Sequence, residues 1–323
     1  MTQVSVVMPV FNDVGHLPSA VERVLGQRDV EVQLVLVDDG SSDGSRSAVS
    51  AAAERDERVT ALLLPDNRGV AEARRRGVEA ATGEWIWFVD SDDHWPQDAA
   101  ASLLRTALDA QEGGRPVDVV VADALLVPAA GAPRTIPAPR LPVQNASTAV
   151  ELLLRGAITG HLWNKLFRRE LLLGVDFPRA RVQSDLALVA NALTAAGSIA
   201  FCGRTVYEYR KRTGSIITSR HRRAESLAVV DATVLDAASR AGIAATAPAV
   251  TYFRLRYIAL SGVKDALSGA YDEAESRALV AAARRRIGLR GLRVLAQRRD
   301  KRVVLAALAY APRPLQLRLL GPR

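Results

Sequence analysis

Two groups of carboxylates follow apolar, strand-like runs, and they are the residues best suited to chemistry. The stretch GEWIWFVDSDDHWPQD, residues 83–98, carries Asp90, Asp92 and Asp93 directly after the apolar run 85–89. Carboxylates this close together repel one another, so a positively charged partner is expected. Mg²⁺ and Mn²⁺ prefer carboxylate oxygens and are often completed by substrate phosphates. The stretch therefore indicates a metal site, although a capped turn before a helix would use the same residue types.

A second pair of carboxylates, Asp38 and Asp39, follows another apolar run about 50 residues earlier. Strand-like and helical patterns alternate through this part of the sequence. That alternation is typical of an α/β fold with a mainly parallel sheet covered by helices on both faces. Ligands bind beyond the carboxyl ends of the strands in such sheets. Both groups of acids are therefore expected at one rim of the sheet.

The expected elements follow from hydrophobic periodicity and from turn residues. Strands are expected at residues 4–11, 31–40, 59–65, 85–89 and 117–127, and helices at residues 16–27, 42–56, 70–82 and 97–110. Five prolines between residues 128 and 142 indicate an irregular loop. Helices are expected again at residue 148, at residues 161–173 and from residue 224 onward, where Ala, Leu and Arg recur with a helical period.

The expected helix at residues 161–173 carries a histidine and a lysine, His161 and Lys165, at the spacing that shares one face. Trp163 and Phe167 are expected in the core. His161 would line a substrate site or make a structural hydrogen bond. The four histidines of the chain are scattered and do not have the spacing of a zinc site.

Composition excludes several classes of protein. The 323 residues are 49% hydrophobic and 24% charged, which is ordinary for a globular chain. A single cysteine, Cys202, allows no internal disulfide and fits the reducing cytoplasm as a buried side chain. The first residues do not resemble a signal peptide, and no apolar run approaches the length that spans a bilayer.

Six segments occur in the order found in a known family: VSVVMPVFND, VLVDDGSSDGS, NRGVAEARRRGVEAATGEWIWFVDSDD, WNKLFRRELL, QSDLAL and YEYRKRTGSIITS. Together they resemble the family-2 glycosyltransferases, which are inverting, sugar-nucleotide-dependent enzymes of the GT-A fold. The resemblance covers roughly residues 4–219. It implies a GT-A catalytic domain over residues 1–220, with a nucleotide-binding half at about 1–127 and an acceptor half at about 128–220. A basic helical region would follow at residues 221–323.

The resemblance also implies roles for individual residues. The donor-binding residues would be Pro9, Val10, Asn12, Asp38, Asp39, Arg74, Asp90, Ser91 and Arg210. Among them, Asp39 would accept a hydrogen bond from the uracil N3–H group, with Asp38 supporting the pocket. Arg74 would lie on the nucleotide side. Asp92, together with Asp90, would ligate the Mn²⁺ or Mg²⁺ ion of this DxD motif.

Asp185 matches the position of the family's general base, a carboxylate at the start of a helix. The preceding residue departs from the family pattern, because Ser184 stands where an acid is usual. Ser184 as a helix N-cap and Asp185 as a first-turn acid would be a purely structural alternative. Asp93 would support the metal ligands without touching the ion, or cap a helix, as readily as it would bind the metal itself.

The segment after Tyr209 would supply positive charge to the diphosphate of the donor. Arg210 is the preferred candidate in it, beside Lys211 and Arg212, and a solvated charge run is the alternative. A Gln-x-x-Arg-Trp signature of processive synthases does not occur in the sequence. A non-processive hexosyl- or N-acetylhexosaminyltransferase is therefore expected, acting on a cell-surface glycan, teichoic-type polymer or lipid-linked precursor.

The positive charge of the chain is concentrated at its C-terminal end. Residues 284–323 hold twelve Lys or Arg and one acid, within a total net charge of +8, so the rest of the chain is mildly acidic. Arg alternates there with Leu, Val and Ile, which suits an amphipathic segment on the inner, anionic face of the cell membrane. The alternative is that the apolar stripe packs on the domain. Few aromatic residues accompany the charge, which argues against nucleic acid, and a homodimer through these helices is also consistent with the sequence.

Two other functions compete with the transferase. A sugar nucleotidyltransferase would need a Gly-rich phosphate loop after the first strand, as a dinucleotide-dependent dehydrogenase would. The sequence has PVFNDVGHLP there, with a single Gly. A non-catalytic binding module with a degenerate transferase fold, acting through the basic tail, is favoured only by Ser184.

Overall fold

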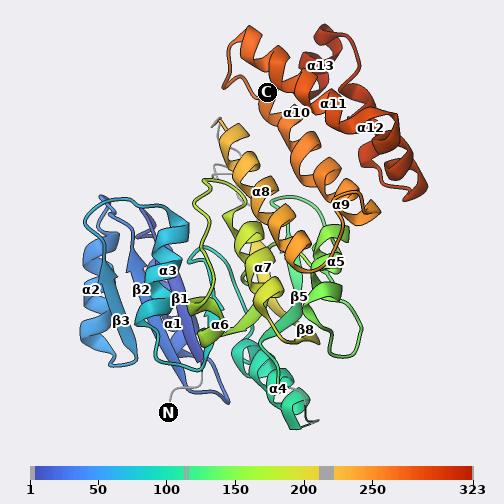
Figure 1. The fold of residues 1–323 in the computed structure, drawn as a ribbon. Helices are drawn as coiled ribbons and strands as arrows, with labels where there is room; N and C mark the ends of the chain where they lie inside the picture. Colours follow the sequence, from blue (N-terminus) through green and yellow to red (C-terminus); the bar gives the residue numbers. More distant parts are fainter. Residues whose placement is uncertain (1–3, 113, 115, 211–221, 322–323) are drawn as a thin grey trace.

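One mixed β-sheet with helices on both faces forms the centre of the protein (Figure 1). The computed structural model describes residues 4–112, 114, 116–210 and 222–321. Within them the sheet has eight strands in the order β3-β2-β1-β4-β7-β5-β6, and β8 pairs with β5. The strands are β1 (Val4–Val10), β2 (Val32–Asp38), β3 (Val59–Leu63), β4 (Trp85–Phe88), β5 (Val119–Val127), β6 (Arg134–Ile136), β7 (Lys165–Arg168) and β8 (Ile199–Arg210).

The helices alternate with the strands as far as β8 and then follow one another. They are α1 (Leu17–Leu25), α2 (Ser45–Arg55), α3 (Val70–Ala80), α4 (Ala99–Glu112), α5 (Ala146–Arg155), α6 (Arg169–Leu173), α7 (Ser184–Ala195), α8 (Ala224–Arg240), α9 (Pro248–Phe253), the π-helix η1 (Arg254–Ala259), α10 (Leu260–Ala266), α11 (Glu273–Gln297), α12 (Arg302–Leu308) and α13 (Arg313–Leu320).

The first half of the sheet confirms the expected βα alternation. Strand β1 lies between β2 and β4, and these strands run parallel, with β3 parallel to β2 on the outside. Every residue of β2 is buried, as are all but one of β1, because helices cover both faces. Their sequences are therefore continuous apolar runs, and this made the strands recognisable.

The second half of the sheet differs from the expectation of a helix over residues 161–173. A strand, β7, occupies residues 165–168 and runs antiparallel to both β4 and β5, and only the short helix α6 follows it. Leu166 packs in the core on one face of the sheet and Phe167 in the core on the other. A short run that is apolar on both faces has no period that separates strand from helix. The sheet is therefore mixed, although most of its strands are parallel.

Two hydrophobic cores fill the two faces of the sheet. Helices α3, α5, α7 and α8 contribute to the core that contains Val7, Val35 and Phe88. Helices α1, α2 and α4 contribute to the core that contains Met8 and Trp87. The expected burial of Trp163, Phe167 and Cys202 is confirmed. This close-packed interior holds the strand ends in fixed relative positions.

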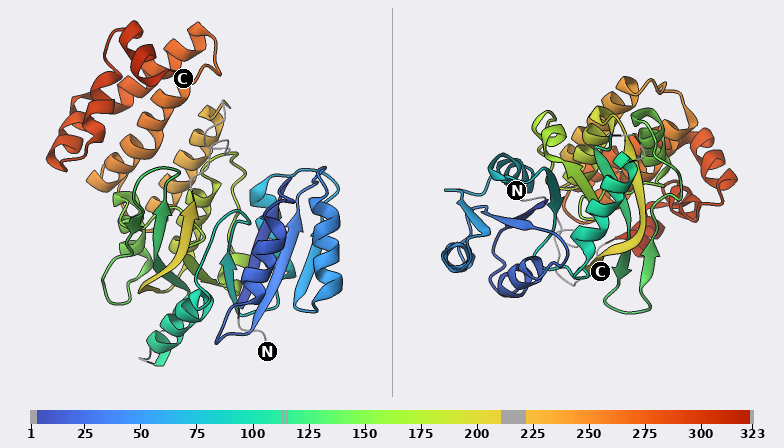
Figure 2. Two further views of the ribbon diagram at one scale, coloured as in Figure 1. Left: turned by 180° about the vertical axis from the view of Figure 1, so that it is seen from behind. Right: turned by 90° about the horizontal axis from the view of Figure 1, so that it is seen from below.

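The C-terminal part of the chain is helical, as expected. Helices α8 and α9 join the core formed with α5 and α7, whereas η1 to α12 surround a third hydrophobic cluster of their own. Helices α11 to α13 stand at one end of the molecule and α4 at the opposite end (Figures 1 and 2). Among the described residues, none of the helices has the length and apolar character needed to cross a membrane.

Candidate active site

The loops after β1, β2 and β4 are joined to one another by hydrogen bonds. The Oγ of Ser91, after β4, donates to Oδ2 of Asp13, after β1. The backbone N–H of Ser42, after β2, donates 2.8 Å to Oδ1 of Asn12, after β1. Parallel strands end at the same edge of a sheet, which explains why these loops meet. The structure thus places both acidic groups at one rim.

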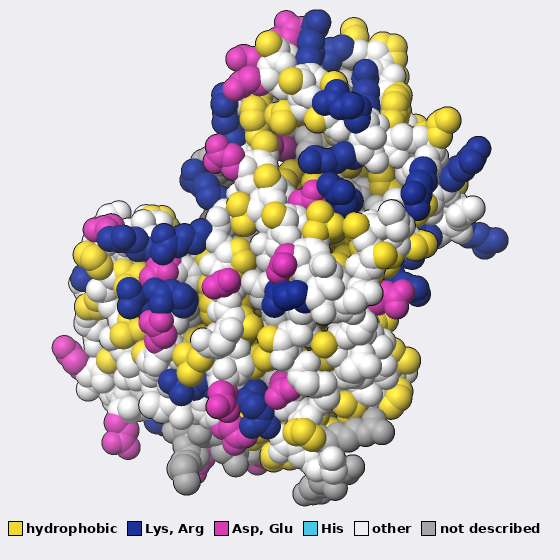
Figure 3. Space-filling model, viewed as in Figure 1, with side chains coloured by type: hydrophobic (Ala, Val, Ile, Leu, Met, Phe, Trp, Pro, Cys, Tyr) yellow, Lys and Arg dark blue, Asp and Glu magenta, His cyan; other side chains and the backbone are white. Residues whose placement is uncertain are grey.

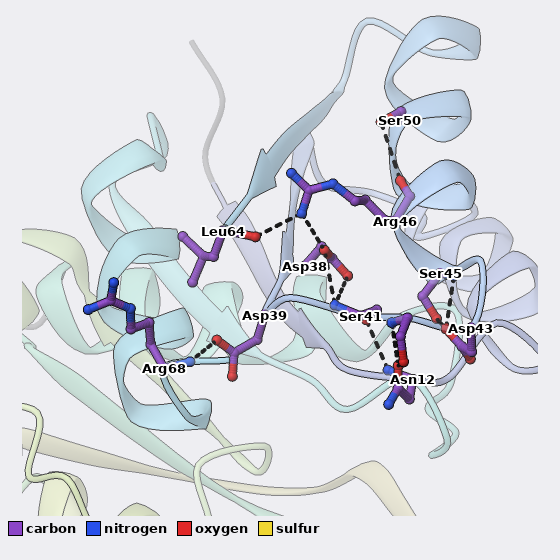
Figure 4. A network of polar contacts seen from close by, with 11 residues as sticks. Asn12, Asp38, Asp39, Ser41, Asp43, Ser45, Arg46, Ser50, Leu64 and Arg68 are labelled. Atoms are coloured by element: carbon purple, nitrogen blue, oxygen red, sulfur yellow. Dashed lines mark hydrogen bonds and ion pairs between the residues drawn. The ribbon is translucent and has the colours of Figure 1, made fainter. Parts of the chain in front are cut away.

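Asp38 lies beneath the loop that follows β2, and its side chain is fully buried (Figure 4). Its carboxylate accepts hydrogen bonds from the backbone N–H of Ser41, at 3.3 and 3.4 Å, and from Nη1 of Arg46, at 3.2 Å. The same Nη1 donates 2.8 Å to the carbonyl oxygen of Leu64, after β3. Asp38 therefore holds the loop after β2 in place through the hydrogen bonds of its buried carboxylate.

Asp39 fixes the start of α3 (Figure 4). Its Oδ1 accepts from the backbone N–H of Arg68 at 2.7 Å and its Oδ2 from that of Gly69 at 2.8 Å. Burial raises the pKa of this carboxyl, and the two backbone donors oppose that rise. The neighbouring Gly40 has φ +73°, and a Cβ there would lie 2.6 Å from the backbone nitrogen of Asn67. Only glycine lets these two loops approach so closely.

Arg74 joins two carboxylates that sequence reasoning did not connect. The residue is 4% exposed, on α3. Its Nη1 lies 2.5 Å from Oδ1 of Asp185 on α7, and its Nη2 lies 3.2 Å from Oδ1 of Asp90 after β4. Burial raises the pKa of Asp90 to about 6, although the charge of Arg74 acts against it. One buried guanidinium thus sets the relative positions of Asp90 and Asp185.

Asp93 is buried, whereas the other two carboxylates of its motif are partly exposed. Its Oδ2 accepts from the hydroxyl of Tyr207 at 3.0 Å and its Oδ1 from the backbone N–H of Arg210 at 2.9 Å. The Tyr207 hydroxyl also accepts from the backbone N–H of Asp90 at 3.0 Å. Burial and the charge of Asp90 raise the pKa of Asp93 to about 8. Asp93 therefore ties the acidic loop to the end of β8.

Asp90 and Asp92 remain as the carboxylates that fit a divalent cation. Both are partly exposed, and both offer the hard oxygen ligands that Mg²⁺ and Mn²⁺ prefer. In the part of the chain that the structure describes, no three His, Cys, Asp or Glu side chains are grouped closely enough to hold a metal ion alone. This donor set fits a cation that is completed by substrate phosphates and water, rather than one enclosed by protein.

Asp185 lies in the first turn of α7. The structural alternative for Ser184 as a helix cap is wrong. Gln183, with φ +60°, occupies the N-cap position without a side-chain capping bond, and Ser184 is the first helical residue. The Ser184 hydroxyl is 3.4 Å from Oδ1 of Asp185 and can donate to it. The carboxylate is thus held between Arg74 and Ser184.

Stacked aromatic rings border this site and were not foreseen as a group. The Trp163 ring lies between those of His161, at 4.5 Å, and Tyr207, at 4.7 Å, with nearly parallel planes. Tyr209 stacks at 5.8 Å from Trp163. Trp163 and Tyr207 are buried, whereas His161 and Tyr209 are partly exposed. The sequence placed His161 and Trp163 on a helix, so it gave no signal for their stacking with β8.

Lys165 does not share a helix face with His161, because it begins β7. Its Nζ donates to the carbonyl oxygens of Thr159, at 2.8 Å, and His161, at 2.5 Å, and to Oδ1 of Asn164, at 2.9 Å. Burial lowers the pKa of this fully buried lysine to about 7, while the charge of Asp185 raises it. Lys165 therefore holds the turn that carries His161.

The remaining expected donor residues lie at the same rim. Val10 is buried, Pro9 is partly buried, and Asn12 adopts a left-handed conformation with φ +49°. The Arg210 side chain is half-exposed, and its Nη2 lies 3.3 Å from Oε2 of Glu208. Lys211 and Arg212 lie outside the described residues.

The part of the chain that forms the acidic rim matches a known protein family. Residues 5–125, which contain the acidic rim, match the family model described as glycosyl transferase family 2. Over these residues the chain resembles glycosyl transferase family 2. The matched segment covers β1 to β4 and most of β5, and thus the loops that carry Asp39 and Asp90.

Three relatives match about two thirds of the chain. They are glycosyltransferase GlyG of Streptococcus pneumoniae, 28% identical over 223 residues, the succinoglycan biosynthesis protein ExoO of Rhizobium meliloti, 31% identical over 218 residues, and EpsH of Bacillus subtilis, 28% identical over 221 residues. Each match covers 66% of this chain. It covers 72% of GlyG but only 62% of ExoO and of EpsH.

Solved structures extend the likeness over nearly the whole chain and show the GT-A fold. TarS of S. aureus, residues 1–349 in complex with UDP-GlcNAc, is 17% identical, with 95% of this chain and 90% of that chain covered and a TM-score of 0.68. The mannosyltransferase PcManGT of Pyrobaculum calidifontis, in complex with GDP-Man and Mn²⁺, is 22% identical, with 97% and 82% covered and a TM-score of 0.53.

Proposed function

We propose that the protein is a metal-dependent inverting glycosyltransferase. It would move a sugar from a nucleotide sugar, with UDP as the nucleotide, to a hydroxyl of a cell-surface glycan, teichoic-type polymer or lipid-linked precursor. The observation that carries the proposal is the buried Arg74, which holds the candidate base Asp185 next to the acidic loop at Asp90. The match of residues 5–125 to the family-2 model and the names of GlyG and ExoO support the transferase class.

The donor would bind over the loops after β1 and β2. Asn12 lies at this surface, Asp38 holds the loop from beneath it, and Asp39 offers a carboxylate whose position is fixed by two backbone N–H groups. A fixed acceptor is suited to the N3–H donor of uracil because little freedom is lost on binding. The complex of TarS with UDP-GlcNAc supports a UDP-linked donor.

Asp92 and Asp90 would hold a Mn²⁺ or Mg²⁺ ion between the loop and the donor diphosphate. When bound, such an ion supplies positive charge that stabilises the departing diphosphate. The complex of PcManGT with Mn²⁺ supports this choice of ion. Arg210, at the end of β8, would add positive charge on the phosphate side, since Asp93 anchors its backbone.

Asp185 would act as the general base. In an inverting transfer the acceptor hydroxyl attacks the anomeric carbon from the side opposite the diphosphate and gives its proton to a carboxylate there. Arg74 and Ser184 hold Oδ1 of Asp185, so the carboxylate stays in one orientation. The partly exposed rings of His161 and Tyr209, which both stack on Trp163, would line the acceptor side.

The first test is calorimetric titration of UDP into the purified protein, with Mn²⁺ and then with EDTA. We expect binding that requires the metal, and we expect the Asp92→Ala variant to lose it. Asp109→Ala, an exposed acid on α4, is the matched control and should bind UDP as the unchanged protein does. Normal metal-dependent binding by Asp92→Ala would refute the metal assignment.

Turnover separates the transferase from a non-catalytic binding module. Metal-dependent UDP binding without hydrolysis or transfer of any of a panel of UDP-sugars would favour the binding module. A complete lack of UDP binding in both conditions would overturn the donor assignment. Release of UDP from one of the donors would support the transferase and identify the sugar.

A further inference from the structure

The helices α11 to α13 carry positive charge that the protein does not neutralise. Among the described residues, eight exposed cations have no carboxylate partner: Arg285, Arg286, Arg290, Arg293, Arg298, Arg299, Lys301 and Arg318. The acids of this region are already paired. Glu273 binds Arg277, Glu275 binds Arg222, and Asp300 binds Arg302 and the hydroxyl of Tyr252. An accumulation of unpaired charge of one sign favours a partner of the opposite sign.

Large apolar side chains are exposed among these cations. Leu289 is 77% exposed and Val304 is 63% exposed, and Leu315, Leu317 and Leu319 are each exposed by more than two fifths. A single exposed leucine is normal for a protein surface. Here five large apolar side chains are exposed within 31 residues of sequence, among exposed cations. Such an accumulation indicates a partner with an apolar part.

The apolar and basic side chains share helix faces. In α11, Gly291 and Leu295 are buried against the helical region, and Leu289 and Arg293 lie on the opposite side, four residues apart. In α13, Leu315, Arg318 and Leu319 are spaced by three and four residues and are all exposed. Figure 3 shows basic and hydrophobic side chains side by side over these C-terminal helices.

The apolar residues of the region thus divide into two sets. Val280, Ile287 and Leu295 pack in the third hydrophobic cluster, as the packing alternative expected. Leu289 and Leu315 have no such role, because they lie on the outer side. Packing within the domain therefore explains one set of residues and leaves the outer set unexplained.

We infer that the exposed face of α11 to α13 docks on an anionic lipid bilayer. The arginines and the lysine would bind lipid phosphates, and the leucines would enter the boundary between headgroups and acyl chains. None of the described helices can span a bilayer, so this contact is interfacial. A soluble polyanion, such as a phosphate-rich glycan, would satisfy the cations but leave the leucines in water. The bilayer accounts for both.

This inference goes beyond the proposed function and does not depend on it, because vesicle binding is measured without donor or acceptor. The full chain is sedimented with vesicles of phosphatidylcholine alone and with vesicles that contain about one third phosphatidylglycerol. We expect binding only to the anionic vesicles and a loss of binding as salt is raised. Failure to bind the anionic vesicles at low salt would overturn the inference.

Two variants and a control separate the contributions. The charge variant is Arg285→Gln, Arg286→Gln and Arg293→Gln, and the apolar variant is Leu289→Ser and Leu315→Ser. We expect each to weaken vesicle binding by at least about ten-fold. The control is Arg28→Gln, Arg55→Gln and Arg105→Gln, which removes the same charge from exposed positions elsewhere and should bind normally.

A further outcome would identify a different partner. If the charge variant lost binding, the apolar variant kept it, and soluble polyphosphate of equal charge competed fully, the surface would bind polyanions and the bilayer inference would be wrong. Far-ultraviolet circular dichroism and UDP titration of each variant confirm that the changes leave the fold and the donor site intact.

Discussion

Arg74 and Asp185 are 111 residues apart in the sequence, and their side chains meet at 2.5 Å. The same guanidinium reaches Asp90, so the proposed base and the proposed metal ligand share one buried cation. An arginine can bind two carboxylates in fixed directions because its donors form a planar fork. The relationship makes Arg74 the residue that sets the geometry between the two halves of the site.

Arg74→Lys should therefore impair the enzyme although it keeps the charge. An ammonium group cannot reach both carboxylates in the same geometry, and a misplaced base costs on the order of 10²-fold in rate. We expect kcat to fall by that factor in a transfer or donor-hydrolysis assay. Arg76→Lys, on the exposed side of the same helix, is the matched control. Equal activity of both variants would mean that the bridge has no part in catalysis.

Asp185→Asn should separate donor binding from chemistry. The amide keeps the shape of the side chain but cannot accept the proton, so we expect kcat to fall by about 10²–10⁴-fold. The affinity for UDP in the presence of Mn²⁺ should change little, as calorimetry would measure. Ser184→Ala, which changes the adjacent hydroxyl, should have a much smaller effect on kcat. Undiminished turnover by Asp185→Asn would place the base elsewhere.

Asp92 and Asp93 should respond differently to the same isosteric change. We expect Asp92→Asn to weaken metal-dependent UDP binding by at least about ten-fold, because the carboxylate is a proposed metal ligand. Asp93 binds Tyr207 and the backbone of Arg210 instead, and an amide oxygen can accept one of these bonds. Asp93→Asn should therefore stay within about three-fold of the unchanged protein. The opposite ranking in calorimetry would make Asp93 the ligand.

Acid should destabilise the protein in part through His161. Burial and the charge of Lys165 lower the pKa of this histidine to about 4, from an ordinary value of 6.5. Between these pH values the unfolded chain binds more protons than the folded one, so the free energy of unfolding falls as the pH falls from 6.5 toward 4. The contribution is on the order of 3 kcal/mol.

The measurement is urea denaturation at pH 7 and pH 4.5, compared between the unchanged protein and His161→Phe. Phenylalanine preserves a ring against Trp163 but does not titrate. The free energy of unfolding should fall less between pH 7 and pH 4.5 in the variant than in the unchanged protein. The contributions of the other titrating groups are the same in both proteins and cancel in the difference. An equal loss in both proteins would show that His161 is protonated in the folded state.

The sequence by itself determined the parallel half of the sheet and the acidic loops at its rim. Residues of β1 and β2 are buried on both faces, so they read as continuous apolar runs that end in polar loops. The first three segments that resemble family-2 glycosyltransferases are also continuous stretches of sequence, because each includes residues of one such strand and the loop that follows it. The loop after β2 and the loop after β4 each contain their own carboxylates, and parallel strands bring them to one edge.

Only the tertiary structure decided how these residues pair. The bridge from Arg74 to Asp185, the bond from Tyr207 to Asp93 and the stacking of Trp163 on Tyr207 each join segments from different parts of the chain. The short strand β7 is another example, because its apolar run packs on two faces and has no period of its own. Such contacts depend on the packing of the whole sheet. They cannot be predicted from the residue types or the spacing within a single segment.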